Sequence, residues 1–188
     1  MAEPKRKATY DDVLAAPEHK VAEILDGELF LSPRPALTHA LVSSNLLVAI
    51  GGAFGREGGD AARPGGWWIL AEPELHFDAD VVVPDIAGWR RERLPRVPDA
   101  PWLELAPDWL CETLSPSTAR IDRTRKLAIY ASGGVRHVWL VDPLARTLEV
   151  LALDDGRWII AGTHAGDEIV RAEPFAAIEI ELARLWID

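Results

Sequence analysis

The chain of 188 residues is 48% hydrophobic and 27% charged, which predicts one folded domain over residues 1–188 with a sizeable core. Its formal net charge of −10 argues against a general nucleic-acid coating protein, because such proteins draw their affinity from clustered lysine and arginine. The single cysteine, Cys111, excludes an internal disulfide, and the polar N-terminus and the lack of any window near about 18 apolar residues predict a cytoplasmic protein without a membrane partner.

The first third of the chain predicts a short helix, a hairpin and a long helix. The short helix is expected at residues 10–16. The segment Val21–Ser32 carries the turn signal Asp26-Gly27 between apolar flanks, which is typical of a β-hairpin. From Ala36 to Phe54 apolar residues recur at helical spacing, so we expect the first main helix here.

Three strands and a long loop are expected next. Proline and turn residues separate the strands, which are Trp67–Ala71, Glu74–Phe77 and Val81–Trp89. The segment Arg90–Pro107 contains four prolines, which favour a loop.

A strand, a helix and a second strand follow in the order of a βαβ crossover. They are expected at Trp109–Leu114, at Asp122–Ser132 and at Val135–Val141, with helix-start chemistry in residues 115–118 and a stop at Gly133-Gly134. Such a crossover implies a parallel strand pair with the helix packed on the sheet.

The last part predicts a second hairpin, formed by Thr147–Leu153 and Arg157–Ala161 around the turn Asp155-Gly156. The sequence does not decide whether residues 175–186 form a strand or a helix. The whole order predicts an α/β (α+β) fold with a mixed sheet flanked by helices and additional hairpins.

Two acidic residues interrupt apolar strands, where an unpaired charge would be costly to bury. In VVVPDIAGW, strand alternation places Asp85 on the face of Val81 and Ala87. In WLCETL, Glu112 lies in the middle of the strand between leucines of its own face, and we expect it to point inward. Two inward carboxylates on neighbouring strands predict a site for Mg²⁺ or Mn²⁺, which can activate water.

Lys126 is the third candidate, because a lysine beside a metal can orient the attacking water or neutralise charge on a phosphate. It lies 126 − 112 = 14 residues after Glu112, so the helix must fold back over the strand to bring the two together. On that helix the spacing places Arg123, Lys126 and Tyr130 on one stripe, which suits a phosphate backbone.

Each candidate has a structural alternative. Asp85 could close a turn or pair with Arg90, Glu112 could form an ion pair with Arg123 or Arg136, and Lys126 could be a solvated helix residue. Two basic clusters could supply a local nucleic-acid surface or could be solvated charged faces, and a homodimer would duplicate the first of them. They are Arg90, Arg91, Arg93 and Arg96, and Arg120, Arg123, Arg125 and Lys126.

Three sequence runs resemble the Uma-two family, which belongs to the PD-(D/E)XK nuclease superfamily. They are GELFLSP with His39 after it, VVVPDIAGW, and ETLSPSTARIDRTRKLAIYASGGVRHVWLVDP, the last being the most specific. The resemblance extends over most of the chain. It implies a restriction-endonuclease-like fold and hydrolysis of phosphodiester bonds in DNA or RNA, with Mg²⁺ or Mn²⁺ as cofactor.

The resemblance assigns the superfamily's aspartate to Asp85 and its strand acid to Glu112. The superfamily's lysine should stand two residues after that acid, where this chain has Leu114, and the resemblance implies that Lys126 on the following helix replaces it. A helix glutamate that assists metal binding is also missing. As supporting residues we expect Glu28 or His39 in its place, together with Arg123 and Tyr130.

Two functions follow from these patterns. The first is a metal-dependent endonuclease, favoured by Asp85, Glu112 and Lys126. The second is a non-catalytic, dimeric nucleic-acid-binding or protein-interaction module that retains the fold, favoured by the acidic balance and by Leu114 at the lysine position. In both, a homodimer is expected.

Overall fold

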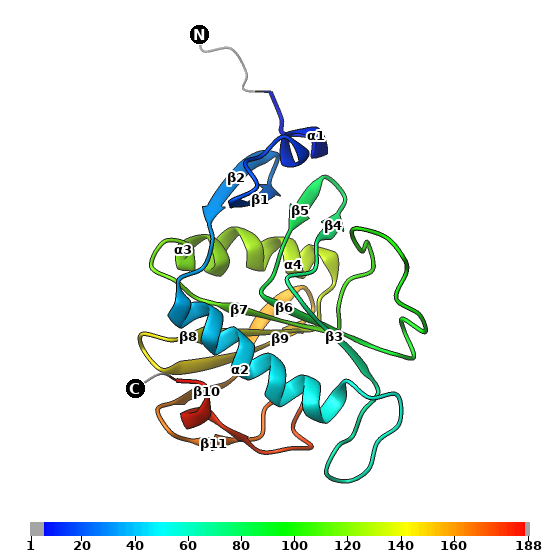
Figure 1. Ribbon diagram of the computed structural model, residues 1–188, viewed down its shortest axis with the longest axis vertical. Coiled ribbons are helices and arrows are strands. Elements are labelled where there is room, and N and C mark those ends of the chain that lie inside the picture. Colours follow the sequence, from blue (N-terminus) through cyan, green and yellow to red (C-terminus); the bar gives the residue numbers. More distant parts are fainter. Residues whose placement is uncertain (1–5, 187–188) are drawn as a thin grey trace.

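The computed structural model describes residues 6–186 and is built around a six-stranded mixed sheet. The strands lie in the order β10-β9-β8-β7-β6-β3 (Figure 1). Their bounds are β3 Trp67–Ala71, β6 Ile86–Arg90, β7 Trp109–Thr113, β8 His137–Asp142, β9 Thr147–Asp154 and β10 Arg157–Ala165. Strands β7 and β8 are parallel and the other neighbours are antiparallel, so the predicted mixed sheet is confirmed.

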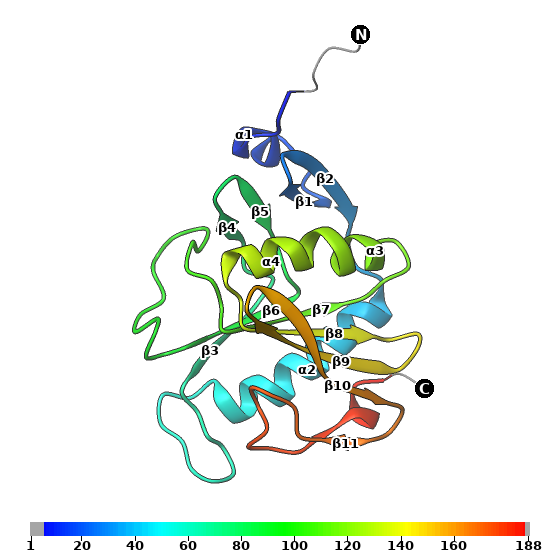
Figure 2. The same cartoon turned by 180° about the vertical axis from the view of Figure 1, so that it is seen from behind.

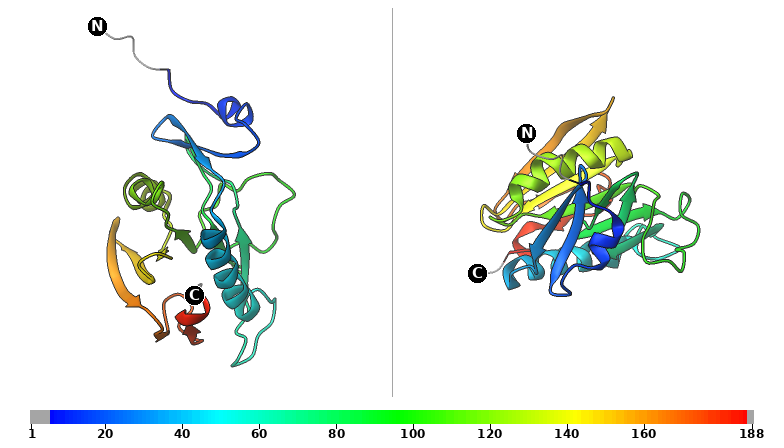
Figure 3. Two further views of the ribbon diagram at one scale, coloured as in Figure 1. Left: turned by 60° about the vertical axis from the view of Figure 1, so that its left-hand side comes forward. Right: turned by 90° about the horizontal axis from the view of Figure 1, so that it is seen from above.

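Helices cover both faces of this sheet. Helix α2 (Leu37–Phe54) packs on one face, and the helix that links β7 to β8 packs on the other (Figures 1 and 3). The linking helix consists of α3 (Ala119–Ile121), a π-helical turn (Asp122–Lys126) and α4 (Leu127–Gly133), and it ends at Gly134 with φ of 81°. The predicted βαβ crossover is therefore present, with its helix folded back over the strand.

A second, smaller sheet lies at one end of the molecule, beside α3 and α4 (Figure 2). Its order is β2-β1-β5-β4, and its bounds are β1 Lys20–Leu25, β2 Glu28–Pro33, β4 Leu75–Phe77 and β5 Asp80–Val82. The predicted turn at Asp26-Gly27 joins β1 to β2, with positive φ at both residues, and the short helix α1 (Tyr10–Leu14) precedes it.

The segment Val81–Trp89 was expected to form one strand, and that prediction was wrong. Strand β5 ends at Val82 in the small sheet, and β6 begins at Ile86 in the large one. Pro84 has no N–H to donate, and the N–H of Val83 donates to the Glu23 side chain instead of to a strand. Asp85 therefore lies at the crossing between two sheets, and strand alternation from Val81 does not determine its direction.

Helix α2 corrects a second expectation. Its 18 residues are long and apolar enough, by length and composition, to cross a membrane, although we expected no such window. One face of the helix is buried in the core through Val42, Leu46 and Ile50. A core helix meets the same criterion of length and composition, and 28% of this window is buried inside the structure.

The end of the chain, which the sequence left open, contains both kinds of structure. Strands β11 (Ile169–Val170) and β12 (Ile180–Glu181) pair with each other, and a 3-10 turn covers Leu182–Arg184. This segment brings Phe175 under the large sheet.

Phe175 is fully buried at the centre of an aromatic cluster. Its ring lies 4.7 Å from that of Phe54 and 4.9 Å from those of Trp67 and Trp109, measured between centroids. Trp139 adds a further edge contact at 5.7 Å. Tryptophans of three strands and a phenylalanine of α2 thus meet on one ring, which joins the C-terminal segment to the core.

Phe175→Ala should lower the free energy of unfolding by about 3–5 kcal/mol, because it removes a large buried ring and leaves a cavity. Urea denaturation followed by tryptophan fluorescence measures this change. The control is Leu144→Ala, at a side chain that is 74% exposed, with an expected effect within about 0.5 kcal/mol. Equal stability of the two variants would contradict the prediction.

Candidate functional site

The candidate site is a cavity of about 380 Å³ between the small sheet, the start of α2 and the helix after β7. Carboxylates and bases from all of these elements line it, together with the loop of residues 115–118. The charged lining residues are Glu23, Arg34, His39, Glu72, Asp85, Glu112, Asp122 and Lys126. The structure therefore places the three principal candidates of the sequence, Asp85, Glu112 and Lys126, around one space.

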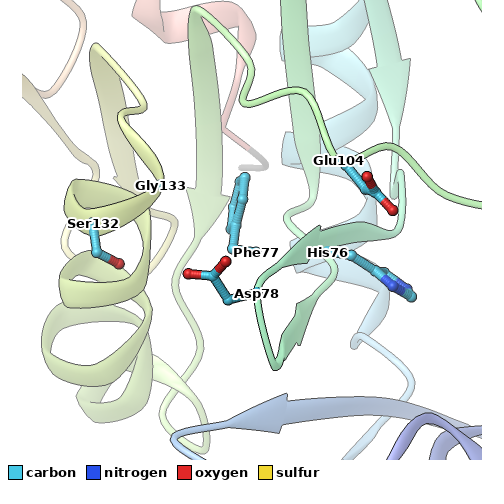
Figure 4. A pocket seen from close by; sticks show the side chains of 6 residues that line it. All are labelled: His76, Phe77, Asp78, Glu104, Ser132 and Gly133. Atoms are coloured by element: carbon cyan, nitrogen blue, oxygen red, sulfur yellow. The ribbon is translucent and has the colours of Figure 1, made fainter.

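A larger cavity of about 540 Å³ lies between the β4–β5 hairpin and the end of α4, and Figure 4 shows its lining. In Figure 4 His76 and Glu104 lie on one side and Ser132 on the other, with Asp78 between them. His76 is already held by Glu74 at 2.8 Å and stacks on Trp102. We therefore place the chemistry in the first cavity.

Lys126 and Glu112 form a buried ion pair. The Nζ atom of Lys126 lies 2.8 Å from Oε1 of Glu112, and the hydroxyl of Tyr130 donates to the same oxygen. Both charged side chains are about 95% buried. The pairing depends on the crossover, because the helix that carries Lys126 and Tyr130 returns over β7 after leaving it.

Two further acids surround Lys126, and the sequence analysis missed both. Oε1 of Glu23 on β1 lies 3.0 Å from Nζ, and Oδ1 of Asp122 lies 3.9 Å from it. The sequence could have indicated Asp122, because it stands four residues before Lys126 on a helix and side chains at this spacing are neighbours. The indication for Glu23 was weaker, because it is an acid among the apolar residues of VAEIL.

Asp85 is held from two sides. Its Oδ2 accepts the backbone N–H of Thr113 at 2.6 Å and lies 3.3 Å from Nε2 of His39. One turn further along α2, the hydroxyl of Ser43 bonds that of Thr113 at 2.8 Å. Thr113 directly follows Glu112, so these contacts link the position of Asp85 to that of the strand acid.

Burial and charge shift the pKa of several groups in opposite directions. Burial raises the pKa of Glu112 well above its usual range, although the charge of Lys126 opposes the shift. Burial lowers the pKa of Lys126, but Glu112 and Glu23 outweigh it, and the net pKa is raised well above 10.5. Burial also lowers the pKa of His39, while Asp85 reverses the effect and raises it. Lys126 is therefore charged at neutral pH.

The site carries more acid than base, which suits a cation. The lining has five carboxyl groups, those of Glu23, Glu72, Asp85, Glu112 and Asp122, and three basic side chains, those of Arg34, His39 and Lys126. Within residues 6–186 no group of three or more histidine, cysteine, aspartate or glutamate side chains is placed to hold a metal ion alone. Mg²⁺ needs only one or two carboxylates, with water and phosphate as the other ligands, so Asp85 and Glu112 fit that mode of binding.

Glu28 and Arg123, expected as supporting residues, do not line this cavity. Glu28 pairs with Arg125 at 2.8 Å, and Arg123 makes a two-pronged pair with Glu149 at 2.9 and 2.6 Å. The predicted stripe of Arg123, Lys126 and Tyr130 is therefore wrong for Arg123, because Asp122 and not Arg123 lies beside Lys126. His39 and Tyr130 do contact the principal acids.

Several side chains of the two basic clusters contact other side chains of the fold. The guanidinium of Arg91 lies 3.4 Å from the centre of the Trp68 ring, and Arg93 pairs with Asp108 at 2.9 Å. Lys126 is buried, whereas Arg90, Arg96, Arg120 and Arg123 are exposed. A continuous phosphate-binding face therefore does not follow from these clusters.

Comparisons with known proteins agree with this fold. A model of the Uma2 (Uma-two) family, described as "Putative restriction endonuclease", matches residues 8–184. A solved structure from Anabaena variabilis, described as a "putative nuclease belonging to DUF820", is similar with a TM-score of 0.75 and 23% sequence identity. That match covers 95% of this chain and 97% of the other. No curated protein matches the chain.

Asp122 makes stability depend on pH. Burial raises its pKa above 3.8, although Lys126 and Thr118 oppose the shift. The folded state then binds this proton more tightly than the unfolded chain, so stability falls as the pH rises from 3.8 through the folded-state pKa. Asp122→Asn removes the titrating group, and its stability relative to the wild type should increase as the pH rises through this interval.

Urea denaturation between about pH 4 and about pH 8 tests this expectation. Asp154→Asn serves as the matched control, because Asp154 is exposed at the end of β9 and lies outside the cavity. Parallel stability curves for the wild type and Asp122→Asn would show that Asp122 does not titrate as the burial implies.

Proposed function

The chain belongs to the Uma2 family, and from this membership and the site we propose that it is a metal-dependent endonuclease that hydrolyses phosphodiester bonds in DNA or RNA. One observation carries the proposal: Asp85, Glu112 and Lys126 line a single cavity, with Lys126 2.8 Å from Glu112. Lys126 thereby reaches the strand acid from the helix. The position at which the superfamily has its lysine is occupied by Leu114 in this chain.

In this proposal Asp85 and Glu112 hold Mg²⁺ or Mn²⁺, which supplies a water of lowered pKa and offsets phosphate charge. The backbone N–H of Thr113 and the imidazole of His39 hold the Asp85 carboxylate in place. The Tyr130 hydroxyl holds Glu112. Lys126, whose ammonium contacts Glu112 and Glu23, would place a positive charge beside the metal ligand Glu112 and offset charge that develops on the phosphate.

The acidic lining gives a reason for metal dependence. A phosphate that enters the cavity meets five carboxyl groups and the basic side chains of Arg34, His39 and Lys126, so the excess of carboxyl groups opposes its entry. A divalent cation at Asp85 and Glu112 would offset part of that negative charge. Exposed arginines such as Arg96 and Arg120 can add local contacts to the nucleic acid, and a homodimer would double them.

A second candidate is a non-catalytic, dimeric module that binds nucleic acid or protein. It is favoured by the contacts of Glu112, one oxygen of which already accepts from both Lys126 and Tyr130. In that case the ion pair would serve stability, and no metal would bind.

Asp85→Asn, Glu112→Gln and Lys126→Met should each reduce nicking of supercoiled plasmid by about 10²-fold or more. Metal binding separates their roles. In titration calorimetry Asp85→Asn and Glu112→Gln should weaken Mn²⁺ binding because each removes a ligand charge, whereas Lys126→Met should retain it.

The matched control is Glu104→Gln, an exposed acid that lines the other cavity and should leave nicking unchanged. Nicking by the wild type should stop on addition of a chelator. A wild type that neither binds Mn²⁺ nor nicks plasmid would favour the non-catalytic module.

A further inference from the structure

Glu23 is a buried acid of the small sheet, and it was not among the site residues expected from the sequence. It stands on β1, and its side chain is about 8% exposed. Its Oε1 accepts the backbone N–H of Val83 at 2.8 Å and lies 3.0 Å from Nζ of Lys126. One oxygen of Glu23 thus contacts both the strand crossing before Asp85 and the buried lysine.

The contact with Val83 follows from the way the chain changes sheets. Strand β5 ends at Val82, and Pro84 cannot donate a hydrogen bond. The N–H of Val83 lies between the two sheets, and a buried N–H without a partner would be unfavourable. Glu23 supplies the acceptor two residues before Asp85.

The contact with Lys126 ties the ammonium to a strand of the small sheet. Nζ lies 3.0 Å from Glu23, 2.8 Å from Glu112 and 3.5 Å from the carbonyl oxygen of Val83. Two carboxylates therefore share the ammonium. With Glu23 neutralised, the attraction on Nζ from β1 is lost and Glu112 becomes its dominant partner.

We infer that Glu23 is a positioning residue that sets Lys126 and the Pro84-Asp85 segment at the same time. The small sheet is then a functional part of the site, since β1 carries the residue that contacts both Lys126 and the N–H of Val83, two residues before Asp85. The effect on catalysis rests on the proposed nuclease function, whereas the anchoring of Lys126 does not.

Glu23→Gln separates the two contacts. The amide keeps an oxygen that can accept from Val83, but it loses the charge that holds the ammonium. The chain has four lysines, Lys5, Lys7, Lys20 and Lys126, so reductive methylation with formaldehyde followed by peptide mass spectrometry reports on Lys126 directly. Methylation of Lys126 should be slow in the wild type and several-fold faster in Glu23→Gln, with the exposed Lys7 unchanged.

Plasmid nicking is measured on the same samples. In Glu23→Gln, kcat should fall by about 10²-fold, because a displaced catalytic group loses its alignment, and KM for the plasmid should stay the same. Glu179→Gln is the matched control, since it breaks an exposed ion pair with Arg171 away from the cavity and should change neither readout.

Cys111 separates a local change from loss of the fold. It is the single cysteine and is fully buried, so a thiol reagent labels it only when the core opens. If Glu23→Gln exposes Cys111, Glu23→Asp provides the test, because it keeps the charge on a shorter side chain. The rate of Lys126 methylation in Glu23→Asp should then lie between the rates in the wild type and in Glu23→Gln.

The two proposals fail in different ways. Unchanged methylation of Lys126 in Glu23→Gln, with Cys111 protected, would overturn the anchoring role. Faster methylation with unchanged kcat would overturn the link to catalysis. A wild type without nicking activity, but with Lys126 released in Glu23→Gln, would defeat the nuclease proposal and support the anchor.

Discussion

The buried charge of Lys126 is the constraint on which the site depends. An ammonium in the interior requires carboxylate partners, because its desolvation is unfavourable. Glu23, Glu112 and Asp122 provide them from β1, from β7 and from the helix that carries the lysine itself. Three separate parts of the chain must therefore be in place before this charge is satisfied, and the same requirement assembles the cavity.

The topology of the large sheet makes that assembly feasible. Because β7 and β8 are parallel, the chain must cross back over the sheet between them, and it does so as a helix. The crossing places Lys126 and Tyr130 above Glu112, on the face opposite to the aromatic cluster around Phe175. The π-helical turn at Asp122–Lys126 coincides with the charged contacts, a place where such turns are often found in proteins.

The cavity, like the chain as a whole, contains more acidic than basic side chains. Many of its basic residues are engaged in the fold, as Arg93 is with Asp108 and Arg123 with Glu149, while acids gather around the cavity. In the proposed function a cation in the cavity would offset this acidity toward a nucleic acid, which joins the composition of the protein to the metal-dependent chemistry proposed for it.

Local patterns in the sequence determined much of the fold. The Asp26-Gly27 hairpin, helix α2 and the β7–helix–β8 crossover follow from turn chemistry and periodicity over short windows, and charges within apolar strands pointed to Asp85 and Glu112. Only the tertiary structure decided that the segment after Val81 divides between two sheets, that Glu23 and Asp122 join the site, and that Glu28 and Arg123 pair elsewhere. The physical reason is separation along the chain: Glu23 and Lys126 are 126 − 23 = 103 residues apart, and no local pattern encodes which distant carboxylate will satisfy a buried charge.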